Sequence, residues 1–449
     1  MKIIVAGAGE VGFHLAKLLS YESQDITLID LNKDSLSYAD SHLDIRVLRG
    51  DATSISVLRD AQVEKSDLVI AVTSSETTNM TLCMLAKQLG CKRTIARISN
   101  AEFIQNKDII NFSELGIDEL ISPEALAAAE IQLLLDQSAF NYTYEFEEGL
   151  LIMLGVLLPK SAPFVGKTVQ EAAKTFPKLH FMPIAIQRMG TQYTIIPRGD
   201  TVFMEQDQVY FITTNEGVGD LYKFTGKEKK EIKNVMVLGG SRIGFKTARD
   251  LSLNKFNVKL IEKNKEQSFE LADKLPNTLI INGDGRNVEL LEEEDLESMD
   301  AFVAVTGNSE TNIMSCLVAK SKNVKRTIAL VENMDYFQLS HSIGVDTLLN
   351  KKLLAANHIF RYIRRGEVVA MTRLNNLNAE ILEFNVKSNS HLKGKFIRDI
   401  RIPKEATIGG VIRNKQGIVA LGGFQIAEGD RVVVCCLPRA IPKIEKLFL

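Results

Sequence analysis

The sequence predicts an α/β protein in which two doubly wound parallel sheets are each followed by a small α+β domain. Two observations carry this prediction. In both halves of the chain, short apolar runs without polar alternation are interleaved with helical patterns, as expected of parallel strands buried on both faces. The two halves also repeat one another motif by motif, which indicates that a pair of domains was duplicated.

The repeat consists of matching blocks at a nearly constant spacing. MKIIVAGAGEVG near residue 1 matches NVMVLGGSRIG near residue 234, and AVTSSETTNMTLCMLAK from Ala71 matches AVTGNSETNIMSCLVAK from Ala304. The offset is 232 or 233 residues, far above the roughly 20–50 residues of solenoid repeats. We therefore predict doubly wound domains at 1–121 and 233–349, and linking helices with small domains at 122–226 and 350–449.

The composition argues against several classes of protein. A formal net charge of -2 disfavours sequence-independent nucleic-acid binding, which needs a basic surface. The longest apolar run, Leu150 to Leu158, has nine residues, against the roughly 20 that cross a bilayer. The N-terminus lacks a signal-peptide cleavage site. The five cysteines form no CxxC pair, so we expect free thiols in a reducing cytosol and a cytoplasmic protein without membrane insertion.

The first 120 residues contain six apolar runs separated by helical patterns. Six such strands with intervening helices are typical of a Rossmann sheet. The predicted strands are Ile3–Ala6, Ile26–Ile29, Ile45–Leu48, Leu68–Val72, Thr94–Ile98 and Glu119–Ile121.

A glycine-rich loop follows the first strand and opens a helix. Gly7 would permit the tight turn, Gly9 would let a pyrophosphate approach the backbone, and Gly12 would let helix and strand pack closely. The free N–H groups at the start of the helix favour an anion. The full GxGxxG loop is Gly7, Ala8, Gly9, Glu10, Val11 and Gly12.

Asp30 ends the second strand, about 20 residues after the loop. A carboxylate here accepts hydrogen bonds from ribose hydroxyls and repels a 2′-phosphate, which favours NAD(H) over NADP(H). ATP and ADP carry the same ribose and are further candidates. The alternative role for Asp30 is to cap the helix that starts near Asn32.

Other candidates lie at the carboxyl ends of later strands. Asp51 and Ala52 follow the third strand and suit the adenine side, or Asp51 caps the next helix. Thr73 and Ser74 end the fourth strand, where they can face the middle of a nucleotide. Arg97 ends the fifth strand, where it meets a phosphate or forms a surface salt bridge.

The second copy has diverged from this pattern. Ser241 replaces the middle glycine and would crowd a pyrophosphate, and Leu330 stands where Arg97 stands in the first copy. Glu262 keeps the strand-ending acid. We therefore expect weaker, altered or absent nucleotide binding there. The loop of this copy is Gly239, Gly240, Ser241, Arg242, Ile243 and Gly244.

Catalytic motifs are missing from the sequence. None of the six histidines lies in a catalytic motif or recurs at the repeat offset, and HExxH, GxSxG and Walker A patterns are absent. We therefore expect a nucleotide sensor and no enzyme. The alternatives are an NAD-dependent oxidoreductase with unrecognised catalytic residues, and an adenylate sensor for another transporter.

A helix links each doubly wound domain to its small domain. Ser122, Pro123 and Glu124 form a helix start, and Asn350 is the matching cap in the second half. The apolar faces of these helices could pack within the chain or against another subunit. Strands of the small domains are predicted around Leu150–Leu158, Tyr193–Ile196 and Gln208–Thr213, and around Ile381–Val386, Ile418–Leu421 and Arg431–Cys436.

Taken together, these motifs closely resemble the TrkA family, the NAD-binding peripheral proteins of bacterial Trk potassium uptake. The resemblance rests on GAGEVG, the strand-ending Asp30, GDAT, the AVTSSETTNM block and ARIS at 96–99, each followed by a small domain and then repeated. It covers essentially the whole chain and implies alternating N-terminal and C-terminal RCK/KTN domains.

The resemblance also implies a function. Such proteins form a homo-oligomeric ring, here expected to be a tetramer, at the inner face of the cell membrane beneath a TrkH- or TrkG-like potassium channel, which they gate in response to NAD(H) or ATP and ADP. It implies a first site made of Gly7 to Gly12, Asp30, Asp51, Thr73, Ser74 and Arg97. It implies a second site made of Gly239 to Gly244, Glu262, Asp284 and Thr306.

Overall fold

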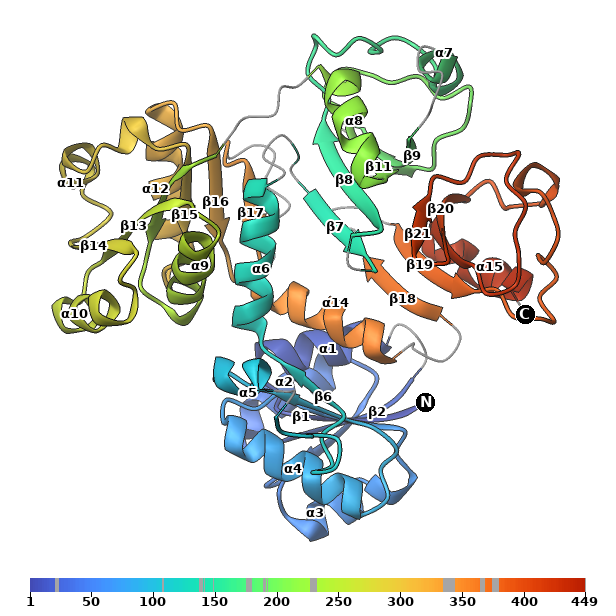
Figure 1. The fold of residues 1–449 in the computed structure, drawn as a ribbon. Coiled ribbons are helices and arrows are strands. Elements are labelled where there is room, and N and C mark those ends of the chain that lie inside the picture. Colours follow the sequence, from blue (N-terminus) through green and yellow to red (C-terminus); the bar gives the residue numbers. More distant parts are fainter. Residues whose placement is uncertain are drawn as a thin grey trace. The chain divides into compact units, whose positions relative to one another are not determined.

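The computed structural model describes most of the chain (Figure 1). The described residues are 1–20, 24–106, 109–136, 140, 142–147, 149–174, 180–188, 191, 193–226, 232–333, 344–363, 368–373 and 379–448. They divide into two compact units. Unit 1 comprises Met1–Ala127 and Asn350–Ile359, and unit 2 comprises Ala128–Leu349 and Phe360–Leu449.

Unit 1 contains the first parallel sheet, with strand order β3-β2-β1-β4-β5-β6. The order reverses between β1 and β4, and ligands of open α/β sheets bind at such a switch point. The strands are β1 (Lys2–Ala6), β2 (Asp25–Asp30), β3 (Arg46–Arg49), β4 (Leu68–Ala71), β5 (Thr94–Arg97) and β6 (Glu119–Ile121). The helices are α1 (Glu10–Ser20), α2 (Lys33–His42), α3 (Ile55–Asp60), α4 (Glu76–Gln88) and α5 (Ala101–Gln105).

Both faces of this sheet are covered, because the strands carry apolar side chains on both sides. Residues Ile3 to Ala6 are all fully buried. Ile4 and Ala6 pack with Leu82 of α4 in one core, and α1 lies on the opposite face (Figure 1). The uninterrupted apolar runs therefore correspond to strands buried on both faces.

Unit 2 contains a second parallel sheet with the equivalent order β14-β13-β12-β15-β16-β17. This repetition confirms the predicted fold class. The strands are β12 (Asn234–Leu238), β13 (Asn257–Glu262), β14 (Thr278–Asn282), β15 (Ala301–Ala304), β16 (Arg326–Leu330) and β17 (Thr347–Leu349). The helices are α9 (Arg242–Leu253), α10 (Lys265–Lys274), α11 (Val288–Glu293) and α12 (Ser309–Ser321).

The two small domains, also in unit 2, are antiparallel sheets with orders β10-β9-β11-β8-β7 and β18-β19-β22-β20-β21. The first has β7 (Tyr142–Phe146), β8 (Leu151–Leu157), α7 (Val169–Lys174), β9 (Phe181–Gln187), β10 (Thr194–Ile195), β11 (Gln208–Thr213) and α8 (Val218–Thr225). The second has β18 (Val368–Arg373), β19 (Glu380–Asn385), β20 (Ala406–Arg413), β21 (Gln416–Ile418), β22 (Arg431–Cys436) and α15 (Ile441–Phe448).

The small domains pack against each other through an apolar cluster that includes Met153 and Ile212 of the first and Ile381 and Val433 of the second. Gly417 makes the approach close, because a Cβ there would overlap the carbonyl oxygen of Leu150. The two sheets therefore share one intrachain core.

One predicted strand, Ile418–Leu421, is wrong. The strand observed there, β21, runs from Gln416 to Ile418 and pairs with β20. Asn414 and Lys415, both at positive φ, form a two-residue turn between the strands. Such a turn fixes the hairpin register, so the strand begins directly after it.

The linking helices are α6 (Pro123–Asp136) and α14 (Lys351–Ile363). Both predicted caps are confirmed. Ser122 accepts a hydrogen bond from the N–H of Ala125, and Asn350 accepts from the N–H groups of Lys352 and Leu353. The start of α14 packs within unit 1, so this helix buries Ala355, Ala356 and Ile359 inside the chain.

Each small domain holds a buried carboxylate in a two-point ion pair. Asp207 is fully buried and accepts from Nε and Nη2 of Arg188, at 3.0 and 3.1 Å. Asp430 is also fully buried and accepts from Nε and Nη2 of Arg413, at 2.6 and 2.7 Å. The pair recurs in both small domains, so it belongs to the duplicated plan.

Replacing Asp430 with alanine should destabilise the protein by about 1–3 kcal/mol, because the N–H of Ala427 and the one-third exposed guanidinium of Arg413 lose their buried acceptor. Glu428 is the control. Its ion pair with Lys393 is half-exposed, so Glu428→Ala should change stability by less than about 1 kcal/mol. Urea unfolding measures both variants. Equal losses would contradict the structural role of Asp430.

Candidate functional site

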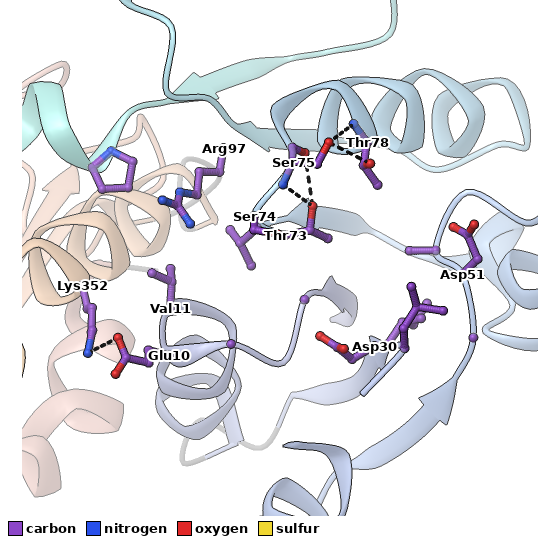
Figure 2. A pocket seen from close by; sticks show the side chains of 18 of the residues that line it. Glu10, Val11, Asp30, Asp51, Thr73, Ser74, Ser75, Thr78, Arg97 and Lys352 are labelled. Carbon is purple, nitrogen blue, oxygen red and sulfur yellow. Dashed lines mark hydrogen bonds and ion pairs between the residues drawn. The ribbon is translucent and has the colours of Figure 1, made fainter. Parts of the chain in front are cut away.

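A cleft of about 510 Å³ opens at the carboxyl ends of the first parallel sheet. It lies at the switch point between β1 and β4, where a ligand is expected. Figure 2 shows side chains from β2, α1 and the end of β4 pointing into it. The structure brings together ten of the residues predicted for the first site: Gly7, Gly9, Glu10, Val11, Asp30, Asp51, Ala52, Thr73, Ser74 and Arg97.

The glycine-rich loop has the geometry that its sequence predicts. Gly7 has a φ of +107°, which disfavours a side chain. A Cβ on Gly12 would overlap the carbonyl oxygen of Gly7, so helix α1 packs directly on the loop. A Cβ on Gly9 would meet nothing within 4 Å, because Gly9 faces the open cleft. Ala8 and Gly12 belong to the loop but do not line the cleft.

Asp30 braces the glycine-rich loop. One carboxylate oxygen accepts from the N–H of Ala8 at 2.5 Å, and the other accepts from the N–H of Asn32 at 2.7 Å. The cap of α2 is Asn32, so the alternative role of Asp30 as that cap is wrong. Each carboxylate oxygen keeps further lone pairs, which can accept from ribose hydroxyls in the cleft.

A buried asparagine fixes the ends of β4 and β5. The Asn79 side-chain oxygen accepts from the N–H and hydroxyl of Thr73, at 2.9 and 2.6 Å. Its amide nitrogen donates to the carbonyl of Arg97 at 2.8 Å. Asn312 makes the same contacts with Thr306 and Leu330 in the second copy. This clamp sets the positions of Thr73 and Arg97.

Polar side chains complete the two ends of the cleft. Asp51 accepts from the N–H and hydroxyl of Thr53, which lowers the pKa of Asp51. The cap position of α3 belongs to Ser54, so Asp51 is not its cap. The guanidinium of Arg97 lies 3.4 Å from the carboxylate of Glu124, so Arg97 forms a partly buried ion pair and lines the cleft as well.

Two lysines in the cleft were missed by the sequence analysis. Lys351 and Lys352 come from the first turn of α14, more than 200 residues from the rest of the site. The ammonium of Lys352 forms an ion pair with the carboxylate of Glu10 (Figure 2). In the sequence, the signal for these residues was the Lys-Lys pair after the helix cap. Local patterns could not show that this helix packs within unit 1, because that packing is a long-range contact.

The second copy keeps the scaffold of the site. Gly239 has a φ of +104°, and Glu262 accepts from the N–H groups of Gly240 and Asn264, both at 2.7 Å. A Cβ on Gly244 would overlap the carbonyl oxygen of Gly239. Thr306 is held by Asn312, as Thr73 is held by Asn79. Ile243 is buried and Arg242 is exposed.

Two pairs of neighbouring core residues around this loop differ in size from those of the first copy. Leu238, which replaces Ala6, packs onto Gly285, and Leu271, which replaces Ala39, packs onto Gly240. The Ser241 hydroxyl donates to the carbonyl of Val305 at 2.8 Å and accepts from the N–H of Gly244 at 3.3 Å. The helix N-terminus is thus capped by its own chain.

The predicted adenine-side acid of the second copy is also engaged. Asp284 accepts from Nε and Nη2 of Arg286, and Lys263 lies 3.2 Å away. These cations hold the pKa of Asp284 well below its usual range. The arrangement is consistent with the expectation that nucleotide binding is weaker, altered or absent in the second copy.

Fold and site together define a protein with two tandem Rossmann-type domains, the first of which has an open cleft at its glycine-rich loop. The TrkA-N domain matches residues 3–123 and 235–351, and the TrkA-C domain matches 153–226 and 381–449. The chain belongs to the TrkA family.

Full-length relatives support the assignment. The chain is 33% identical to "Trk system potassium uptake protein TrkA" of Haemophilus influenzae and 32% identical to the protein of that name of Halomonas elongata. Each alignment covers 100% of this chain and 98% of the relative.

Solved structures share the fold. The crystal structure of the GsuK RCK domain matches with a TM-score of 0.62 at 17% identity, covering 99% of this chain and 94% of that one. The GsuK channel bound to NAD matches with a TM-score of 0.63 at 16% identity, covering 99% and 78%.

Within the described ranges, no helix is long and apolar enough to cross a membrane. The same residues contain no group of three or more His, Cys, Asp or Glu side chains that could hold a metal ion. All five cysteines are buried free thiols, as predicted.

Replacing Gly9 with serine should make the first copy resemble the second. The new hydroxyl would cap α1 as Ser241 caps α9, and it would occupy the phosphate position, so affinity for NADH or ATP should fall roughly tenfold or more. Stability should change by only about a few tenths of a kcal/mol, since serine and glycine are both accepted caps. Calorimetric titration and urea unfolding measure the two effects. Unchanged affinity would show that α1 does not bind the phosphate.

The two copies should differ in occupancy. We expect one nucleotide per chain, lost in Asp30→Ala and retained in Glu262→Ala. Both acids brace a glycine-rich loop in the same way, so any structural effect is matched between the variants. Titration of both purified variants with NADH, NAD, ATP and ADP provides the stoichiometry. Two equivalent sites per chain, or loss of binding in Glu262→Ala alone, would contradict the assignment.

Proposed function

We propose that this chain is a cytoplasmic regulatory subunit of a potassium uptake system, and that it gates a membrane partner in response to a nucleotide bound in the first Rossmann domain. The observation that carries the proposal is the open first cleft, in which Asp30 and the N-terminus of α1 face the same cavity. The association with a potassium uptake system is inferred from the family and from the names of the full-length relatives.

The ligand is an adenine nucleotide with an unmodified ribose. Asp30 disfavours a 2′-phosphate, so NAD(H) is preferred over NADP(H). ATP and ADP remain candidates, because they carry the same ribose. The structural neighbour GsuK has been solved with NAD and with ADP, which fits this range of ligands.

The nucleotide acts as a signal in this proposal, and the chain is not an enzyme. The described residues that line the cleft provide hydrogen-bond acceptors, hydroxyls and cations, with no histidine or cysteine among them. These groups bind and orient a nucleotide. Regulation then requires that the nucleotide bind the open and closed states of the assembly with different affinities, because only that difference shifts the equilibrium. A tenfold shift needs about 1.4 kcal/mol.

The assembly would be a ring of identical chains, a tetramer, at the inner face of the membrane beneath a TrkH- or TrkG-like channel. Several sites in one ring would add their contributions. Small affinity differences at each site would then suffice to switch the channel.

The proposal is tested by potassium uptake in a strain that lacks its own TrkA protein. We expect the wild-type chain to restore uptake and Asp30→Ala to fail at equal protein level. Lys17→Gln serves as control, because Lys17 is an exposed residue of α1 outside the cleft. Restoration by Asp30→Ala, or turnover of NADH by the purified chain, would contradict the nucleotide-sensing role.

A further inference from the structure

The first cleft is polarised along its length. Asp30 and Asp51 lie at one end, whereas Lys352, Glu10 and Arg97 lie toward the other (Figure 2). A nucleotide whose ribose is bound by Asp30 would direct its phosphates past Gly9 toward the cationic end. The residues at that end therefore determine which phosphate groups the cleft accepts.

Lys352 lies at this end of the cleft although it is distant in sequence from most other residues of the site. Asn350 caps α14 and thereby fixes its first turn, on which Lys352 lies. The Lys352 side chain is only 10% exposed, and its ammonium pairs with the carboxylate of Glu10. The helix start packs within unit 1, so the position of Lys352 is part of the compact structure of the site.

Lys352 can exchange Glu10 for a partner that binds its ammonium more strongly. The Glu10 side chain is 65% exposed and stands in the first turn of α1, beside the N–H groups that would bind a phosphate. An ion pair with an exposed carboxylate contributes little, whereas a phosphate held by a helix N-terminus offers several acceptor oxygens to a lysine. A bound phosphate would also place its negative charge close to the Glu10 carboxylate. Lys352 would offset the repulsion between these two negative charges.

We propose that Lys352 is a ligand for the phosphates of the nucleotide in the first cleft, and that it exchanges the Glu10 carboxylate for a phosphate oxygen. This inference rests on the proposed function, since it requires a nucleotide in that cleft. Lys352 thereby sets a preference for nucleotides with more phosphate charge.

Two neighbouring cations support a site for more than one phosphate. Lys351 also lines the cleft. Arg97 lines the cleft, and its guanidinium carries five N–H donors, of which Nη2 pairs with Glu124. Three cations at one end of the cleft suit a nucleoside polyphosphate better than a single phosphate group.

The position of Lys352 has a consequence for regulation. The helix that carries it, α14, is continuous from Lys351 to Ile363 and leads into the second small domain. A phosphate bound by Lys352 would therefore hold the start of a helix that belongs to the second half of the chain. Nucleotide binding in the first half would act directly on an element of the second half.

The experiment compares affinities for ATP, ADP, AMP and NADH in the full chain and in Lys352→Gln, by calorimetric titration. We expect Lys352→Gln to weaken ATP binding by roughly tenfold or more and AMP binding much less, because a hydrogen bond between charged groups contributes about that much. Lys352→Arg should retain most of the ATP affinity. Glu10→Gln should bind ATP at least as tightly as the wild type, and Lys17→Gln should be unchanged.

Hydrogen exchange of α14 provides a second readout. ATP should protect peptides from 350–363 in the wild type and in Lys352→Arg, and should protect them less in Lys352→Gln. Equal effects of Lys352→Gln on all four nucleotides, or none, would overturn the inference while leaving the proposed function intact. If the folded wild-type chain binds none of the four nucleotides, the proposed function fails and the inference with it.

Discussion

The N–H groups at the start of the first helix of each Rossmann domain need an acceptor, and the rest of the site depends on how each copy supplies it. In the second copy, Ser241 caps the helix with its own hydroxyl. In the first copy, Gly9 has no side chain and faces open space. Because Gly12 holds α1 against the loop and Asp30 braces that loop, the start of α1 faces the cleft, where its N–H groups can bind an anion.

The second copy shows how a duplicated domain can keep its fold while core residues around its loop are exchanged. Compared with the first copy, a larger residue at one position is matched by a smaller residue at the neighbouring position. Such paired exchanges conserve the packing density that a protein core requires. The scaffold contacts of the loop, the acid and the buried asparagine are unchanged, which explains why the sheet persists. The paired exchanges are Ala6 and Ala52 for Leu238 and Gly285, and Ala8 and Ala39 for Gly240 and Leu271.

Much of the fold and part of the site could be predicted from the sequence, because both depend on local patterns. The apolar runs specified buried parallel strands, and the loop from Gly7 to Gly12 with Asp30 located the cleft. The contribution of Lys352 could not be predicted, because it depends on α14 packing with residues more than 200 positions earlier. Strand Ile418–Leu421 was misplaced because backbone conformation at Asn414 and Lys415 determines the hairpin.

The central claim is that the first Rossmann domain binds a nucleotide and the second does not. The most direct test is a structure of the chain determined with saturating ATP and, separately, with NADH. The account predicts nucleotide density in the first cleft, with the ribose at Asp30 and the phosphates at the start of α1, and an unoccupied second domain in which Leu238 and Leu271 keep their positions. Nucleotide bound at the second loop, or an empty first cleft, would contradict it.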